Sequence, residues 1–171
     1  MFTEAGCRNF KEKDINIFIL DKDPKLSAQF QCDKHICKMA VESCQILCSV
    51  FYHNSEIVPP YKLTHKNHPC CKWARESLGN FNWLLKHAKS LLKEYAVRYN
   101  KRHKCNDILQ WIADNKSKLQ FDKIKMTSFA QAIPGKYKKD NTVEAYRNYY
   151  KKEKYKFAVW KNSAKPDWFM Q

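Results

Sequence analysis

The chain of 171 residues carries 32 Lys and Arg against 17 Asp and Glu, a formal net charge of +15. Apolar residues make up 44% of it, which excludes wholesale disorder and suffices for one domain with its own core. The sequence shows no apolar run of 18 residues and no signal-peptide pattern at its start. We therefore expect no membrane span, and a reducing, intracellular compartment.

The first part of the chain divides into an arm, an extended run and a helix. Residues 1–14 are polar and poorly patterned, which predicts a flexible N-terminal arm. Residues 15–20 form a β-branched and aromatic run, predicting an extended segment or a small strand. A helix is expected from Pro24 to about Cys32. Because the chain has only 3 glycines, we predict an all-α fold, a compact single-domain helical bundle over residues 15–171.

The clearest helix is predicted from Asp33 to about Tyr52. Its apolar stripe contains Ile36, Cys37, Ala40, Cys44, Leu47, Cys48 and Phe51. Its polar stripe contains His35, Lys38, Glu42, Gln45 and Ser49. Two interpretations of the polar stripe stay open: an ordinary solvent-exposed face, or a line of reactive groups that faces a cleft.

Eight cysteines in a chain without a secretory signal do not indicate a disulfide framework. Cys37, Cys44 and Cys48 share one helical face, where a free thiol packs as a small apolar side chain. The chain has no C-x2-C pair of the kind that begins many zinc sites. The cysteine pattern therefore favours core packing, and we predict neither a metal nor another cofactor.

The stretch "YKLTHKNHPCCKWARESLGN" (61–80) gathers two histidines and two cysteines ahead of a predicted helix. That helix should begin at Pro69, with Asn67 or His68 as its cap. A metal site here would need further ligands, such as Asp33 and His35. We favour phosphate binding at the helix N-terminus, by His65, Lys66, His68, Lys72 and Arg75.

The remaining elements are also expected to be helical. Residues 69–99 form one long helix or two helices broken near Gly79, and another helix covers about 106–116. Residues 117–140 are mostly loop, and a last helix runs from about Asn141 to about Asn162. Its inward side chains should be Tyr146, Tyr150, Phe157 and Trp160. Its candidates for contact with a partner are Arg147, Lys151, Lys154 and Lys161.

The excess of positive over negative charge is confined to the last two-thirds of the chain. Residues 1–57 contain 7 Lys and Arg against 8 Asp and Glu, whereas residues 58–171 contain 25 against 9. Such an excess, with 14% aromatic residues, favours a nucleic-acid partner over merely solvated lysines. Arg98, Arg102 and His103, within "EYAVRYNKRHK", join the candidate contacts.

Four stretches resemble one known family: "INIFILDKDPKLSAQFQCDKHICKMAVESCQIL", "YKLTHKNHPCCKWARESLGNFNWL", "EYAVRYNKRHK" and "VEAYRNYYKKEK…W…KPDWF". They are similar, in the same order over residues 15–169, to phage and large-virus proteins labelled pyrimidine dimer DNA glycosylase or UV-damage endonuclease. The resemblance implies an all-α enzyme, acting as a monomer on damaged or modified duplex DNA.

The resemblance also implies a mechanism. An amine attacks C1′ of the damaged nucleotide, the base leaves, and a Schiff base forms before β-elimination nicks the strand. In the well-studied members the amine is the chain's own N-terminus, but here 14 residues precede "INIF". Either that arm folds back, or Lys38 serves, or no lyase step occurs. Glu42 is the first choice for the assisting carboxylate and Asp33 the second, with His35 on the same stripe.

Base access requires a side chain that wedges into or stacks on the duplex. Tyr61 and Trp73 flank the 65–68 segment and are the candidates. Two alternatives to the glycosylase remain: a non-enzymatic basic protein that binds nucleic acid, and a metal-dependent nuclease using His35, His65 and His68.

Overall fold

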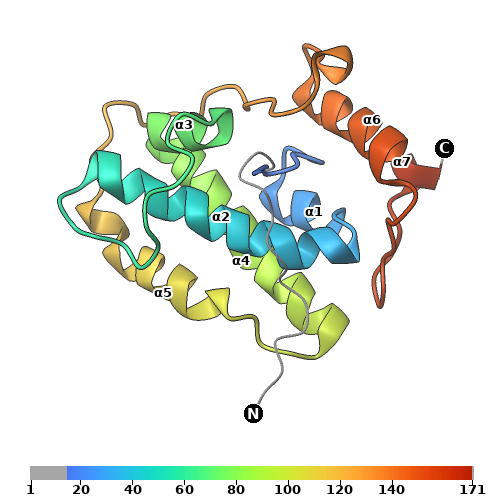
Figure 1. Cartoon of the computed structure of the whole chain (residues 1–171), viewed down its shortest axis with the longest axis horizontal. Coiled ribbons are helices and arrows are strands. Elements are labelled where there is room, and N and C mark those ends of the chain that lie inside the picture. The colour runs from blue at the N-terminus through green and yellow to red at the C-terminus, as the bar shows by residue number, and fades with distance from the viewer. Residues whose placement is uncertain (1–14, 171) are drawn as a thin grey trace.

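The computed structural model describes residues 15–170, and this part of the chain is helical (Figure 1). The elements are α1 (Pro24–Gln29), α2 (Asp33–Asn54), α3 (Pro69–Glu76), α4 (Leu78–Tyr99), α5 (Cys105–Asn115), the 3-10 helices η1 (Lys116–Lys118) and η2 (Gly135–Tyr137), α6 (Thr142–Lys154) and α7 (Asp167–Met170). No strand occurs among residues 15–170, so the all-α prediction is confirmed. None of these helices is long and apolar enough to cross a membrane.

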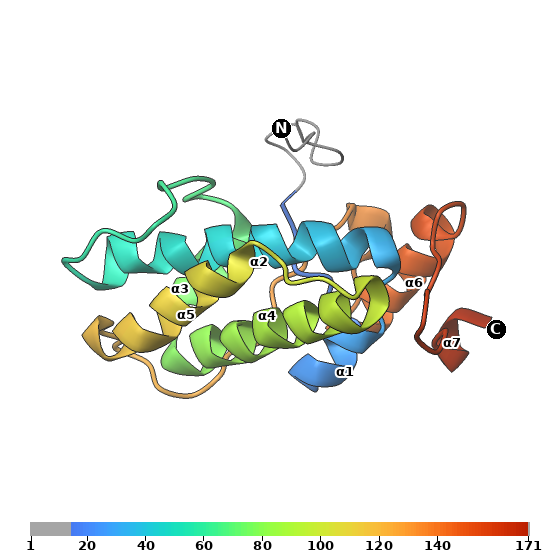
Figure 2. The same cartoon turned by 90° about the horizontal axis from the view of Figure 1, so that it is seen from below.

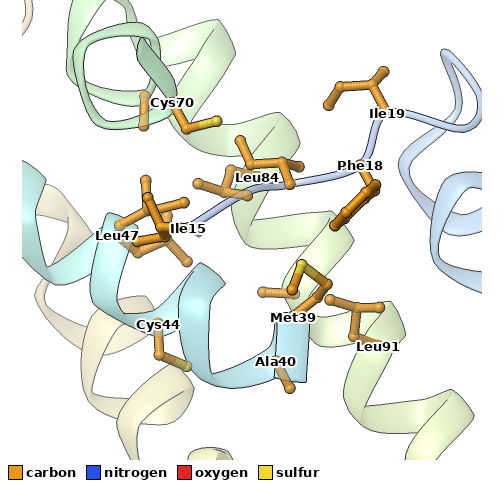
Figure 3. Packing of buried hydrophobic residues seen from close by; sticks show 14 of the residues in the cluster. Ile15, Phe18, Ile19, Met39, Ala40, Cys44, Leu47, Cys70, Leu84 and Leu91 are labelled. Carbon is orange, nitrogen blue, oxygen red and sulfur yellow. The ribbon is translucent and has the colours of Figure 1, made fainter. Parts of the chain in front are cut away.

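Helices α2 and α4 form the centre of the fold. They pack against each other, with α1 against α4, α3 against both, and α5 against both (Figure 2). The buried faces of these helices share one apolar cluster, part of which Figure 3 shows around Met39, Leu47 and Leu84. Helix α6 lies near the N-terminal end of α2, whereas α3 lies toward its C-terminal end (Figure 1). Helix α6 contacts η2 and α7.

Local capping chemistry sets the helix boundaries. Asp23 caps α1 by accepting hydrogen bonds from the backbone N–H groups of the first turn, and Pro24 follows it. His68 caps α3, as expected, because its Nδ1 accepts a hydrogen bond from Cys70 N at 3.2 Å. Ser77 ends α3 and caps α4, so the two-helix alternative is right, with the break two residues before Gly79.

Residues 15–20 are extended and buried, but they pair with no strand. Side chains from other elements satisfy their backbone instead: Gln31 Nε2 donates to the Ile17 carbonyl at 2.9 Å, and Leu20 N donates to the Ser27 hydroxyl. In Figure 3 the segment threads between α2 and α4, with Ile15 and Phe18 among the buried side chains. The small strand is therefore not formed: residues 15–20 belong to no helix or strand, and Phe18 among them has a positive φ.

The C-terminal part departs from the sequence-based expectation. Helix α6 ends at Lys154 rather than near Asn162, and the short α7 was not predicted. Tyr146 and Tyr150 are fully buried, while Phe157 and Trp160 are only partly so. On α2, Cys44 and Cys48 are buried as predicted and Cys37 is half-buried. The predicted arm, residues 1–14, lies outside the described residues.

Candidate active site

A cavity of about 520 Å³ opens where the extended segment meets α2, α3 and α6. Polar and cationic side chains dominate its wall. It is lined by Ile15, Asn16, Phe18, His35, Lys38, His68, Pro69, Gln131, Ala132, Ile133, Pro134, Lys138, Tyr149 and Lys154. It therefore brings together four of the predicted residues, His35, Lys38, His68 and Lys154, with further residues from the C-terminal third of the chain.

Glu42 does not itself line this cavity, but its two partners Asn16 and Lys38 do, and its side chain is 7% exposed. Its Oε2 accepts a hydrogen bond from the backbone N–H of Asn16 at 2.7 Å. Its Oε1 lies 3.3 Å from Nζ of Lys38, one helical turn earlier on α2. With His35 and Ser49 also buried, the polar stripe of α2 is not an ordinary solvent-exposed face.

His35 forms part of the aromatic wall of the cavity. Its ring stacks on Phe18 with the centroids 4.4 Å apart and meets Tyr150 edge-on at 5.1 Å. Burial, with the positive charges of Lys154 and Lys38, lowers the pKa of His35 to about 3, so the ring is neutral near pH 7. Within residues 15–170 its Nδ1 has no hydrogen-bond partner.

Phe18 and Tyr149 continue that wall. Their rings are parallel within 4°, with centroids 6.3 Å apart, and Nζ of Lys154 lies 4.9 Å from the Tyr149 ring centroid. The backbone of Phe18 has φ 57, a conformation that costs a bulky residue about 1–3 kcal/mol. Bonds from Ser27 and Gln31 to its carbonyl hold it there. The surrounding structure thus fixes an aromatic ring and a cation together at the cavity.

The 65–71 segment does not converge on a metal site. His68 reaches the cavity, but its Nδ1 is engaged in capping α3, and burial followed by the charge of His65 lowers its pKa. Cys70 and Cys71 are buried in the core. No group of three or more His, Cys, Asp and Glu side chains among residues 15–170 is placed to hold a metal ion. The nuclease hypothesis based on His35, His65 and His68 therefore has no ligand set in this part of the chain.

Two of the predicted site residues have structural roles instead. Arg98 is 1% exposed, and its guanidinium donates to the carbonyls of Gln31 at 2.7 Å and Gln29 at 2.9 Å. It also pairs with Asp33 and Glu94, both at 3.1 Å. This corrects the prediction of Arg98 as a DNA contact, because no donor is left at the surface. Asp33, predicted as the second catalytic carboxylate, is committed to this pair and does not line the cavity.

The other predicted contacts are dispersed. Arg147 is partly buried, pairs with Asp21 at 2.8 Å and lies over the rings of Phe30 and Trp168. Arg75 donates to the Lys66 carbonyl at 2.6 Å. Exposed or partly exposed positions elsewhere on the surface are occupied by Lys66, Lys72, Arg102, His103, Lys151 and Lys161.

The predicted wedge residues lie away from the cavity. The Tyr61 hydroxyl is 3.8 Å from Sγ of Cys105, and Trp73 is buried against Trp83 and Phe129. Besides His35, the aromatic side chains that line the cavity are those of Phe18 and Tyr149, which the sequence analysis did not identify. No local pattern links these two, because they come from opposite ends of the described chain.

A helical protein with a buried carboxylate next to a cavity lined by lysines and aromatic rings offers chemical groups that suit base excision from DNA. A sequence profile of the family described as pyrimidine dimer DNA glycosylase matches residues 15–107, more than half of the chain. The chain belongs to this family, whose enzymes are glycosylases and AP lyases that excise UV-damaged bases from DNA. No curated protein and no solved structure matches the chain.

Proposed function

We propose that the cavity beside Glu42 is the site where the damaged nucleotide loses its base. The observation that carries this proposal is the buried Glu42 carboxylate, held by Asn16 N at 2.7 Å and Lys38 Nζ at 3.3 Å. A carboxylate fixed in this way stabilises positive charge that develops at C1′, or activates a water molecule. DNA, as a damaged duplex, is the substrate that the family implies.

The side chains around Glu42 have complementary roles in this proposal. Lys138 and Lys154 are cations at the cavity and suit the phosphates that flank the damaged nucleotide. Phe18, Tyr149 and the neutral His35 offer ring faces for a base that has left the stack. The Phe18–Tyr149 wall thereby takes the wedge or stacking role first expected of Tyr61.

Lys38 is the amine that we propose for the lyase step. After Nζ of Lys38 has given up a proton to water, it attacks C1′; the electrons of the glycosidic bond leave with the base, which takes up a proton. A proton then moves from the attached nitrogen to O4′, and the sugar opens to a protonated Schiff base. Removal of a C2′ proton then expels the 3′ phosphate and cuts the strand. The nearest alternative position is Asn16 N, but this is an amide nitrogen with a delocalised lone pair, so it is no nucleophile in the intact chain.

Borohydride trapping on UV-irradiated duplex tests the assignment. We expect the full chain and a chain lacking residues 1–14 to form the covalent adduct, and Lys38→Ala to lose it. A third form of the protein begins at Asn16, so that the backbone amide beside Glu42 becomes an α-amine. A substantial fraction of such an amine is neutral near pH 7. Trapping that disappears with residues 1–14 and persists in Lys38→Ala would transfer the role to an amine of the arm.

Binding should depend steeply on salt, because lysines at the cavity and on the surface would release counterions from the DNA. Each neutralised phosphate contributes about −0.9 to the slope of log K against log salt. Several contacts therefore give a slope of several units. An affinity that stays the same between low and moderate salt would contradict the proposed DNA surface.

We further propose that the protein is a viral enzyme that acts as a monomer in the reducing cytoplasm or nucleus of the host, with residues 15–171 as one functional domain. The cysteines among residues 15–170 are all free, which supports a reducing compartment. The continuous apolar cluster that joins α1 to α6 supports one domain. Light scattering of the purified protein, which should give the mass of one chain, tests the monomer.

A further inference from the structure

A second hollow lies on the other side of α2 from the cavity. In Figure 1 the C-terminal half of α4 and the start of α5 lie below α2, whereas α6 and the segment that leads to it lie above. Between α4 and α5 is a groove of about 740 Å³. Its walls are formed by Lys89, Leu92, Lys93, Ala96, Asn100, Lys101, Arg102, Asn106, Leu109 and Gln110.

The groove is strongly one-sided in charge. Four of its lining residues are cations and none is a carboxylate. Within residues 15–170, no ion pair involves Lys89, Lys93 or Lys101. Arg102 pairs with Asp107, but both side chains are largely exposed, so the pair is open to competition by another anion. The remaining polar side chains of the groove are the amides of Asn100, Asn106 and Gln110. Asn106 and Gln110 each already donate one hydrogen bond, to the His103 carbonyl and to Asp114, and each amide nitrogen carries a second hydrogen that can reach a phosphate oxygen.

Helix stability alone does not explain this charge. Lys101 and Arg102 follow the C-terminus of α4, where cations offset the helix dipole. Lys89 and Lys93, however, lie well before that end and are four residues apart on one exposed face. Like charges at this spacing repel each other and destabilise a helix slightly. A polyanion in the groove would relieve that repulsion.

We propose that this groove binds the phosphate backbone of a second DNA segment, so that one copy of the protein bridges two duplexes. The proposal rests on charge complementarity, and on the position of the groove across α2 from the cavity. The Lys and Arg side chains carry the affinity, whereas the buried Leu92 and Leu109 form the floor. Binding in the groove is independent of sequence and of damage, because it reads only phosphate.

The test is a bridging assay. An undamaged duplex is fixed to beads, the protein and a fluorescent undamaged duplex are added at low salt, and the retained fluorescence is measured. The variant Lys89→Glu/Lys93→Glu removes the groove's positive charge. The variant Lys118→Glu/Lys125→Glu makes the same change of charge at two exposed lysines outside both the groove and the cavity. Cleavage of UV-irradiated duplex by each variant is measured in parallel under single-turnover conditions.

We expect the groove variant to lose at least tenfold of the bridging while cleavage stays within about twofold of wild type; the control variant should keep both. Absence of bridging by wild type, unchanged bridging by the groove variant, or equal loss in the control would overturn the proposal. Two protein copies per bridge, measured by light scattering, would overturn it as well. Glu42→Gln separates the two proposals: loss of cleavage with bridging intact is expected, because this carboxylate acts in the chemistry and not in holding DNA. Wild-type cleavage by Glu42→Gln would overturn the catalytic assignment and leave the groove proposal standing.

Discussion

The backbone nitrogen of Asn16 donates a 2.7 Å hydrogen bond to Oε2 of Glu42. This bond ties the extended segment to the middle of α2 and leaves Oε1 of the same carboxylate beside Nζ of Lys38. A carboxylate that a backbone donor and an ammonium group hold inside a protein is costly to bury and fixed in direction. We therefore expect substitutions at Glu42 to be tolerated less well than substitutions at the other residues of the site.

Glu42→Gln should keep the fold but abolish most of the chemistry. The amide oxygen can still accept the Asn16 N–H, so we expect the free energy of unfolding to fall by no more than about 3 kcal/mol, from the weakened contacts to Asn16 N and Lys38 Nζ. Strand cleavage of UV-irradiated duplex should fall by about 10²-fold or more, since the negative charge is gone. Glu76→Gln, on the exposed end of α3, is the matched control and should cleave as wild type does. Wild-type cleavage by Glu42→Gln would show that the carboxylate has no catalytic role.

Arg98→Met should be among the most destabilising substitutions in the protein. Met keeps much of the apolar stem but removes the guanidinium from the carboxylates of Asp33 and Glu94 and from two carbonyls; among residues 15–170 only Asp33 retains another donor, the N–H of Lys161. The expected loss in urea unfolding is about 3–5 kcal/mol. Arg102→Met removes an ion pair that is largely exposed to solvent, so it should leave the urea midpoint close to that of wild type. Similar small losses for both variants would mean that the Arg98 network adds little.

Gly79 lies in the first turn of α4, and its N–H donates to the Ile124 carbonyl at 3.0 Å. A Cβ placed on Gly79 would come within 2.4 Å of Met126 N, a backbone atom that cannot simply rotate away. We expect Gly79→Ala to cost about 1–3 kcal/mol in denaturant unfolding. Gly135→Ala is the natural comparison, because nothing lies within 4 Å of its added Cβ; its effect should stay within about 0.5 kcal/mol. Equal effects at the two glycines would indicate that the 123–126 segment yields easily.

Acid should destabilise the protein through two buried histidines. Burial lowers the pKa of His35 to about 3 and that of His87 to about 4, against 6.5 for an ordinary histidine. Below pH 6.5 the unfolded chain therefore binds protons that the native chain does not. The free energy of unfolding should fall as the pH drops from 6.5 toward 4, by up to about 1.4 kcal/mol per pH unit for each histidine. Urea unfolding of wild type and His35→Phe across this range measures the slope, which the variant should roughly halve; an unchanged slope would place the proton uptake elsewhere.

Local patterns predicted the helices well, because the signals that start and stop them are local. His68 before Pro69 marks the start of α3, and the apolar spacing of α2 identifies its buried face. The end of α6 was misplaced because the residues after Lys154 retain helix-like composition. After Lys154, tertiary hydrogen bonds hold the chain in a non-helical conformation; for example, the N–H of Asp33 donates to the Val159 carbonyl at 2.8 Å.

Local sequence patterns identified the residues of the cavity one helix at a time: the pair on α2, His68 at the start of α3 and Lys154 on α6. Lys38 and Glu42 share a face of α2, and their spacing revealed them as a pair. Arg98 was misassigned because a cation in a basic stretch gives no sign of burial until its partners from α1 and α2 are in place. Asn16, Phe18 and Tyr149 were missed because the tertiary fold, and no sequence spacing, brings them together.

The hydrogen bonds of Asn16 have a consequence for the order in which the protein acquires its activity. Its side chain donates to the Ala132 carbonyl at 2.8 Å and accepts from the Tyr146 hydroxyl at 2.9 Å, while its backbone reaches Glu42. Closing such long loops is slow compared with forming helices. A nascent chain released only as far as residue 107, where the family match ends, would hold Lys38 and Glu42 in a half-built site. We therefore expect the protein to gain base-excision activity late in synthesis, in one step, when α6 packs against the segment that contains Asn16.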